Sequence, residues 1–397
     1  MRRPLSRSGS GGLERHRPRP RIMNLSLTEE QRLLGETVTR FVADRYDFLS
    51  RERYVREPPG FSRAIWAEFA QLGLLALPFA EQDGGFGAGG VETMLVMQAL
   101  GRGLVVEPYL STVVLCGTAL ALAATPAQKA ILLPGLIAGE TLIALAHGER
   151  HAPRHTLTQI RTKATRRNGY WLLDGEKSAV LDGDSADKLI VSARTDQGIA
   201  LFLVDARAEG VTVRGAPTYD GRRIADVTFE AAPVAADAML GAPGAGAGIL
   251  RSVIETAIAA LTAEAVGIME ATLDMTTEYL KTRHQFGVAI GSFQALQHRC
   301  VDMLIQLELA RSMALFAAVS LPLEDAGTRS RNISAAKIQI GRSGRFIGQQ
   351  AVQLHGAIGI TAEYQVGHAF KRLTAIDTLF GDANHHLDAL AEAGGLA

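Results

Sequence analysis

The spacing of apolar residues changes twice along this chain, and this change limits the folds open to it. Residues 24–140 mostly follow helical spacing, as at Leu33 and Val38. Residues 141–234 instead hold short segments that are β-branched or alternate in polarity, which is typical of strands. Helical spacing returns after a glycine-rich segment at 241–248 and continues nearly to the end. This order predicts an α+β protein whose strands are gathered in one middle domain.

The expected elements divide the chain into three domains behind a short extension. About seven strands are predicted, and the clearest cover 141–147, 170–180, 187–194, 199–205, 211–213 and 226–231. The later predicted helices cover about 249–280, 293–321, 329–354 and 363–392. The predicted parts are an extension at 1–22, an N-terminal helical domain at 23–140, a middle β-domain at 141–245 and a C-terminal helical domain at 246–397.

The segment 1–22 differs in composition from the rest of the chain. It contains seven arginines and one glutamate but no apolar run, so it cannot bury enough surface to order itself. We expect a disordered extension, with Met23 as the structural start and Ser26 or Thr28 capping the first helix. A transit peptide is the alternative, because the segment is rich in Arg and Ser. The whole chain has zero formal net charge, so the remainder is acidic, which argues against nucleic acid as a partner.

The two cysteines and the apolar stretches of the chain indicate where in the cell the protein works. Cys116 and Cys300 lie far apart in apolar surroundings, which favours free thiols and a reducing cytoplasm. Residues 108–128 carry no charge and are long enough to suggest a membrane span. Proline, glycine and threonine interrupt that stretch, so we expect a buried helix of a bundle and no membrane association.

Two motif-like features do not indicate a ligand. The segment 241–248, GAPGAGAG, approaches the dinucleotide fingerprint but lacks its strand-to-helix unit and its later acidic residue, so we expect a hinge. His385 and His386 are neighbours, and neighbouring side chains on a helix diverge by about 100°. We therefore expect no metal site there.

A more specific combination lies between two predicted helices. Residues 279–303 include RHQFG and then SFQ, and QLHGAIGITAEY follows at 353–364. The chain from about 24 to 392 resembles the acyl-CoA dehydrogenase family of flavoproteins on these segments. The resemblance implies an N-terminal helical domain, a middle β-barrel or sandwich and a C-terminal four-helix bundle. It also implies FAD as cofactor, an acyl-CoA substrate, a tetramer and an electron-transfer flavoprotein as acceptor. Similarity around DTLFGDANHH is strongest to subunits that act on dicarboxylyl-CoA.

The resemblance also assigns residues to the cofactor. In this family the isoalloxazine lies on one subunit's β-domain, while helices of the neighbour hold the adenosine diphosphate. Arg283 would meet the pyrophosphate as a charge-assisted pair, and Gln285 and Phe286 would line the same cleft. The residues that would flank the adenosine are Gln294, Gln353, Gly356 and Ala357, the last replacing the usual second glycine.

The same resemblance places the catalytic base on apolar residues. Dehydrogenation needs a carboxylate to take the weakly acidic α-proton of the thioester, while FAD accepts the β-hydrogen. The family's usual base position falls on Phe380 and its alternative position on Ala257. The nearest carboxylates are Glu255, Asp377 and Asp382. Of these, Glu255 and Asp377 are the fallback candidates for a displaced base.

Two further losses affect the substrate side. Ile258 replaces an arginine that relatives keep near the CoA moiety, and the flavin-side loop reads AHGERHAPRHT at 146–156, with His147 near the place of a threonine. We interpret this loop as a surface loop with solvated histidines; substrate binding is the alternative. Features that reach a neighbour's FAD are retained, so we expect a subunit that works with a larger, base-bearing partner. A self-sufficient dehydrogenase and a non-catalytic binding protein remain the alternatives.

Overall fold

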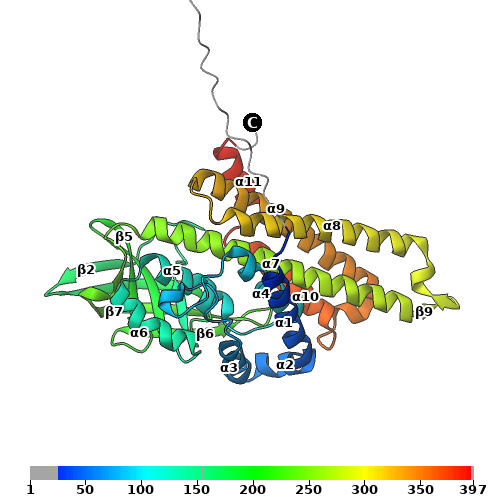
Figure 1. The fold of residues 1–397 in the computed structure, drawn as a ribbon, viewed down its shortest axis with the longest axis horizontal. Helices are drawn as coiled ribbons and strands as arrows, with labels where there is room; N and C mark the ends of the chain where they lie inside the picture. Colours follow the sequence, from blue (N-terminus) through cyan, green and yellow to red (C-terminus); the bar gives the residue numbers. More distant parts are fainter. Residues whose placement is uncertain (1–25, 154, 395–397) are drawn as a thin grey trace, which may run out of the picture.

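The computed structural model describes residues 26–153 and 155–394. Within them a helical N-terminal part, a β-sheet domain and a long C-terminal helical bundle follow one another along the chain, and Figure 1 shows the sheet at one end of the molecule and the bundle running away from it. The predicted α+β fold class is confirmed. The expectations for 1–22 and for Met23 lie outside the described residues.

The N-terminal part consists of short helices around a buried apolar segment. Thr28 caps the first helix and forms a capping box with Gln31, as one of the two expected caps. The uncharged stretch at 108–128 is buried where it forms the π-helical Tyr109–Cys116, as expected for a bundle segment. The helices are α1 Glu29–Arg45, α2 Phe48–Arg56, α3 Arg63–Gln71, α4 Gly90–Arg102, α5 Gly117–Ala123 and α6 Pro126–Ile137.

The middle domain is one eight-stranded sheet, of which seven strands follow the order β6-β7-β3-β2-β4-β5-β8 while β1 pairs with β4 in parallel. Alternation buries every second residue on strands such as β7. The sequence did not reveal β2, whose charged residues are exposed, or the two-residue β8. The strands are β1 Ile143–Ala146, β2 Lys163–Arg167, β3 Tyr170–Leu181, β4 Lys188–Thr195, β5 Gly198–Asp205, β6 Val211–Pro217, β7 Arg223–Ala235 and β8 Met239–Leu240.

Long helices form the C-terminal part. A hairpin of β9 His284–Gln285 and β10 Val288–Ala289 joins the first two of them. The expected single helix at 363–392 is broken at Phe380 and Gly381, whose φ angles are 57° and 109°. Apolar spacing continues through this break, which is why the sequence pattern did not show it. The helices are α7 Gly246–Thr282, α8 Gln294–Ser320, α9 Ala326–His355, α10 Gln365–Thr378 and α11 Ala383–Glu392.

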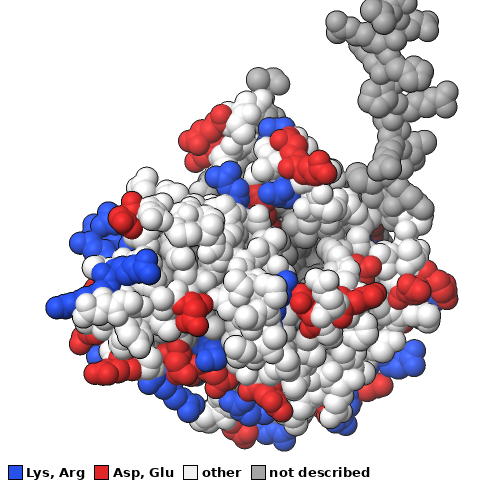
Figure 2. Space-filling model, turned by 60° about the vertical axis from the view of Figure 1, so that its left-hand side comes forward, with Lys and Arg blue, Asp and Glu red and all other residues white. Residues whose placement is uncertain are grey.

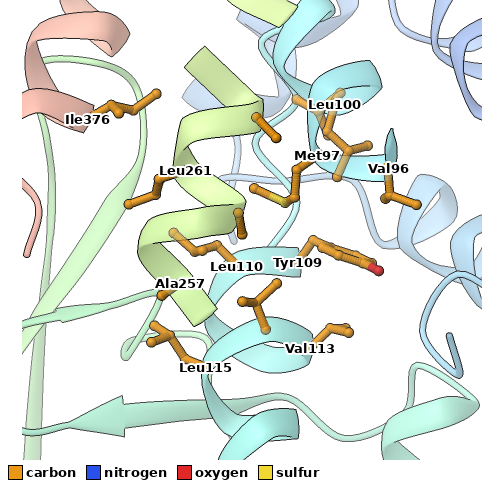
Figure 3. Packing of buried hydrophobic residues seen from close by; sticks show 14 of the residues in the cluster. Val96, Met97, Leu100, Tyr109, Leu110, Val113, Leu115, Ala257, Leu261 and Ile376 are labelled. Carbon is orange, nitrogen blue, oxygen red and sulfur yellow. The ribbon is translucent and has the colours of Figure 1, made fainter. Parts of the chain in front are cut away.

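The central helix α7 connects the domains through close packing. A Cβ at Gly267 would collide with the carbonyl oxygen of Gln98, and one at Gly101 with that of Glu264, so glycine lets α4 and α7 approach closely. Figure 3 shows Ala257 and Leu261 of α7 among buried side chains of the N-terminal domain such as Leu110 and Leu115.

A buried ionic network also joins the domains. Arg372 of α10 donates to Glu264 of α7 at 2.7 and 2.9 Å and to Asp220 of the β-domain at 2.9 Å. Arg222 adds a further bond to Glu264 at 3.0 Å. Because these charges are paired, their burial is tolerated, and loss of one partner would leave an uncompensated charge.

In the part of the chain that the structure describes, two helices, α7 and α8, are long and apolar enough to cross a membrane by length and composition alone. The apolar window of α7 is 83% buried inside the protein, whereas that of α8 is only 39% buried.

In the face shown in Figure 2, acidic and basic side chains are interspersed along the lower rim, with a broad uncharged region above them.

Candidate active site

A cavity of about 730 Å³ lies where the β-domain meets the N-terminal halves of α7 and α9. Its size is that of a small-molecule site. The apolar part of its wall comes from several elements, which are far apart in sequence. These residues are Leu115, Leu145, Leu157, Ile160, Val180, Leu181, Ile254, Ile258, Ile333, Leu379 and Phe380.

The two expected base positions lie in different surroundings. Phe380 lines the cavity. Ala257 is fully buried and packs in the core instead (Figure 3). A carboxylate at position 380 would therefore face a ligand in the cavity, whereas position 257 is not part of the described lining.

Two buried side chains fix the turn that carries Phe380. The Lys337 ammonium donates to the carbonyl oxygens of Ile376, Asp377 and Gly381, each at 2.8 Å. His386 lies 3.2 Å from the Phe380 carbonyl oxygen through Nε2 and 3.1 Å from the Ser334 hydroxyl through Nδ1. Burial lowers the pKa of His386 to about 4, so its ring is neutral near pH 7. Lys337 and His386 therefore both bind carbonyl oxygens of this turn, and together they fix the backbone at residue 380.

Phe380 and Ile258 share one apolar environment. Phe380 packs against a buried cluster that contains Ile258 of α7 and Ile333 of α9. The two positions at which the resemblance expects a carboxylate and an arginine are thus apolar together. Either charged group alone would enter this cluster without a partner, which is costly.

The fallback carboxylates both have cationic partners. Glu255 lines the cavity, but Arg329 of α9 donates to it at 2.7 Å and Ser330 also donates to it. Asp377 accepts from Arg345 at 2.8 Å and does not belong to the cavity lining. Asp382 caps α11 through the backbone of His385. Glu255 is therefore the one member of this group that could meet a ligand directly.

Described residues of the loop at 147–156 form part of the cavity wall. His151 and His155 are exposed, as expected for a surface loop, whereas His147 is not solvated. His147 bridges the Ser192 hydroxyl and the Thr156 carbonyl oxygen, each at 2.8 Å, and burial lowers its pKa to about 4. A neutral imidazole has one donor nitrogen and one acceptor nitrogen. In His147 each of the two nitrogens therefore has a hydrogen-bond partner.

Glu149 anchors the same loop. Its carboxylate accepts from buried Lys177 at 2.8 Å and from the Thr162 hydroxyl at 2.6 Å. Burial opposes ionisation, but these donors and the backbone of Arg161 together lower the pKa of Glu149 to about 2. Glu149 is therefore ionised and fully bonded, and it acts in the structure as an anchor. This role could not be predicted, because the partner Lys177 lies on β3, distant from the loop in sequence.

The residues assigned to FAD lie at the opposite end of the bundle. Contacts between Glu255 and Arg329 at one end, and between Tyr279 and His355 at the other, show that α7 and α9 run in parallel. The Tyr279 hydroxyl donates to the His355 carbonyl at 3.3 Å, and their rings stack at 4.5 Å. This contact brings the segment after α7 next to the segment after α9. The assigned residues Arg283, Gln285, Phe286, Gln294, Gln353, Gly356 and Ala357 are all exposed there.

This exposed end suits an anionic, aromatic cofactor. Among the described residues no side-chain partner is found for the Arg283 guanidinium, whose five donors match phosphate oxygens. Phe286 is 91% exposed and meets Phe293 edge-on at 6.3 Å. Gly356 has φ 65°, and no atom lies within 4 Å of a Cβ built on it, so backbone conformation rather than crowding requires glycine.

Comparison with known proteins identifies the class. Profiles of the acyl-CoA dehydrogenase N-terminal, middle and C-terminal domains match residues 28–140, 144–232 and 244–395. The chain belongs to the acyl-CoA dehydrogenase family, whose members are FAD-dependent oxidoreductases that act on CH–CH bonds. The fold and the cofactor expected from the resemblance are thereby confirmed.

Individual relatives cover most of the chain. A mitochondrial isovaleryl-CoA dehydrogenase of Pongo abelii is 32% identical over 297 residues, which are 72% of this chain and 70% of that protein. The acryloyl-CoA reductase (NADH) of Anaerotignum propionicum is 26% identical, covering 94% of this chain and 96% of its own. Among solved structures, the ChsE4-ChsE5 complex from Mycobacterium tuberculosis aligns with a TM-score of 0.85 at 26% identity, covering 94% of this chain and 100% of the matched chain.

Proposed function

We propose that this chain is the base-lacking subunit of a heteromeric, FAD-dependent acyl-CoA dehydrogenase. In this proposal its bundle end completes the FAD site of a larger partner, and the partner supplies the carboxylate that takes the α-proton. Arg283 holds the pyrophosphate, with Gln285 and Phe286 beside it. Gln294, Gln353, Gly356 and Ala357 flank the adenosine. FAD bound there would supply the hydride acceptor, with an electron-transfer flavoprotein as the expected electron acceptor.

The single observation that carries the sharing of FAD between subunits is the distance between the two regions. Ile258 lines the cavity and Arg283 follows the end of the same helix. At a rise of 1.5 Å per residue the two are separated by roughly 38 Å along α7. One FAD cannot extend over both regions. The bundle end is therefore suited to a cofactor held mainly by another subunit.

The cavity supports the absence of a base in this chain. Position 380 carries phenylalanine in an apolar cluster, and the Glu149 and Glu255 carboxylates of the wall each have a dedicated cation. A general base must be within hydrogen-bonding reach of its proton and able to accept it. A carboxylate already bonded to an ammonium or guanidinium is a weaker acceptor than one held near apolar groups.

Assembly is supported by an apolar face on α8. Val301, Leu304, Ile305 and Leu309 are each about half exposed, with fractions of 53%, 45%, 52% and 46%. A contiguous exposed apolar face of this kind marks an interface. A related solved structure is described as a complex of two different chains, ChsE4 and ChsE5. We propose a tetramer that contains two kinds of dehydrogenase subunit and works in the cytoplasm.

The proposed substrate is an acyl-CoA, with a dicarboxylyl-CoA as the specific form. The similarity of the 377–386 segment to subunits for such thioesters supports this choice. A second candidate, a self-sufficient dehydrogenase that uses Glu255 as base, is favoured by the position of Glu255 in the cavity wall. Its ion pair with Arg329 weighs against that role.

Affinity purification of the tagged chain from its native cells tests the heteromer. We expect a second member of the family to co-purify, with a carboxylate at the position that aligns with Phe380. Mass spectrometry identifies the partner, and absorbance at the flavin band gives the FAD content of the complex. A homo-oligomer that already contains FAD and turns over acyl-CoA would contradict the proposal.

A further inference from the structure

The strand β2 is an edge of the sheet over most of its length. Its pairing with β4 joins only Lys163 to Arg194, whereas β3 pairs with all five of its residues. The Arg194 amide donates to the Thr162 carbonyl oxygen at 2.9 Å, and β4 then ends at Thr195. From Ala164 onward, the side of β2 that faces away from β3 therefore has no neighbouring strand in the described part of the sheet. Figure 1 shows β2 at the end of the sheet domain that lies away from the helical bundle.

This open edge leaves backbone groups without partners. The N–H and C=O groups of successive residues in a strand point to alternate sides. Because the Thr162 carbonyl points toward β4, the backbone groups of Ala164 and Arg166 point the same way, and those of Arg166 lie beyond the last paired residue of β4. Outside the β2–β3 ladder, no hydrogen bond to the N–H or C=O of Arg166 is found among the described residues. A further strand could bond these groups.

Basic side chains follow the same edge. Between Glu149 and Asp174 the sequence contains no Asp or Glu. The exposed basic residues along the edge, called the cationic edge below, are Lys163, Arg166, Arg167 and Arg194. None of them forms an ion pair with another described residue. Asp174 lies opposite Lys163 on β3 but accepts from the Ala231 amide at 2.8 Å. The cationic edge therefore carries positive charge that the described part of the chain does not compensate.

The arrangement of these charges selects the kind of partner. Side chains alternate between the two faces of a strand, so Lys163 and Arg167 lie on one face of β2 and Arg166 on the other. A flat anionic membrane could contact only one of these faces. A second copy of the same edge would place cations opposite cations, which is unfavourable. An extended chain beside β2 alternates with the same period, so its acidic side chains could reach the cations on both faces.

We propose that β2 accepts an extended acidic segment of another protein as an added strand. The segment continues the line that β4 leaves at Thr195, bonds the N–H and C=O of Arg166, and pairs its carboxylates with the cationic edge. In strand addition the main-chain hydrogen bonds give affinity and the side chains give selectivity. None of the residues of the cationic edge lines the cavity or belongs to the exposed end assigned to FAD. The proposal is therefore independent of the proposed function.

Fluorescence anisotropy with labelled nonapeptides tests the proposal on the purified full chain. The acidic probe alternates Glu and Thr, and the control probe carries Lys in place of Glu. We expect saturable binding of one acidic peptide per chain and at least about tenfold weaker binding of the basic peptide, since tenfold in affinity corresponds to about 1.4 kcal/mol. Binding of the acidic probe should weaken as salt is added, because exposed charges are screened. Equal binding of the two probes would overturn the proposal.

Methylated peptides separate strand addition from attraction between charges alone. Two versions of the acidic probe carry methyl groups on alternate backbone nitrogens, one version in each register. Only one of the two sets of nitrogens would face β2, so one version should bind about tenfold more weakly than the other. Equal affinities of the two versions would overturn strand addition.

Variants locate the site. Lys163→Gln, Arg166→Gln and Arg167→Gln together should weaken binding of the acidic probe about tenfold or more. The melting temperature should stay unchanged, because these side chains are exposed. The matched control removes the same charge from exposed residues away from this edge, by Arg207→Gln, Arg214→Gln and Lys371→Gln. An unchanged affinity in the first variant, an equal loss in the control, or tighter binding of a DNA duplex or of phosphatidylserine vesicles than of the acidic probe would overturn the proposal.

Discussion

Phe380 packs against the cluster that contains Ile258, although the two residues belong to segments more than a hundred positions apart. The resemblance to the family predicts a carboxylate at position 380 and an arginine at position 258. Here both are apolar and exclude charge from the same corner of the cavity. A single loss would leave a charged group among apolar neighbours, so the two changes are physically coupled. This shared apolar surrounding supports the proposed loss of the base in this chain.

The Lys337 ammonium should be required to keep the turn at 380 in place. Lys337→Met removes three hydrogen bonds to carbonyl oxygens that are then left buried. We expect a loss of about 2–4 kcal/mol in the free energy of unfolding, because each buried acceptor without a partner costs about 1–3 kcal/mol and the turn can relax in part. Urea unfolding measures this loss. Lys371→Met, an exposed lysine on α10, should change stability little; equal effects of both substitutions would contradict the assignment.

Glu107 should make stability depend on pH. Burial raises the pKa of Glu107 to about 7, against the Ser62 backbone donor that lowers it, and Oε2 has no partner among the described residues. The unfolded carboxyl ionises near its ordinary pKa of about 4.3, so the unfolded chain loses its proton first. The contribution of Glu107 is therefore fully present below that pH and is lost as pH rises through about 7.

Glu107→Gln tests this dependence directly. At pH 8 the variant should be more stable than the wild type by on the order of 1–3 kcal/mol, and at pH 4.5 the two should differ much less. Denaturant unfolding at both pH values measures the difference. A gap between the two proteins that is the same at pH 4.5 and pH 8 would show that Glu107 does not titrate in this range.

Arg283 should control flavin retention rather than folding. Its side chain is exposed and has no described partner, so Arg283→Ala should leave the melting temperature of the chain unchanged. In the assembled complex, loss of a charge-assisted bond to phosphate should lower FAD affinity roughly tenfold or more. Flavin absorbance after dialysis measures the loss. Arg207→Ala, an exposed arginine of the β-domain, serves as the control, and equal flavin content in both variants would rule out the role.

Much of the fold followed from the period of the apolar residues. The order of helical and strand regions, the Thr28 cap and the burial of the 108–128 stretch depend on local patterns, which a single sequence contains. The strand β2 was missed because it presents charged side chains on an exposed face. The break between α10 and α11 was missed because it depends on Lys337, a residue forty positions earlier that caps the carbonyl groups.

The residues of the candidate active site could be predicted only where they belong to a recognisable sequence motif or lie at a fixed distance from one. RHQFG and the later QLHG gave the exposed residues at the bundle end, and counting from them placed Phe380 at the cavity. The role of the 146–156 loop could not be read, because Glu149 and His147 depend on Lys177 and Ser192 of the sheet behind them. The Arg329 partner of Glu255 was likewise not visible, since it belongs to a helix that is distant in sequence.

Anaerobic mixing of acyl-CoA with the purified chain in the presence of added FAD, unmodified and as Phe380→Glu, tests the absence of a base most directly. Loss of a positioned general base typically costs about 10²–10⁴ in rate. We expect flavin reduction with the unmodified chain alone to be slower, by about that factor, than flavin reduction in the complex of the chain with its partner. Phe380→Glu should gain rate if acyl-CoA enters this cavity, and Phe380→Gln controls for the altered packing. Flavin reduction by the unmodified chain alone at the rate of the complex, abolished by Glu255→Gln, would contradict the account.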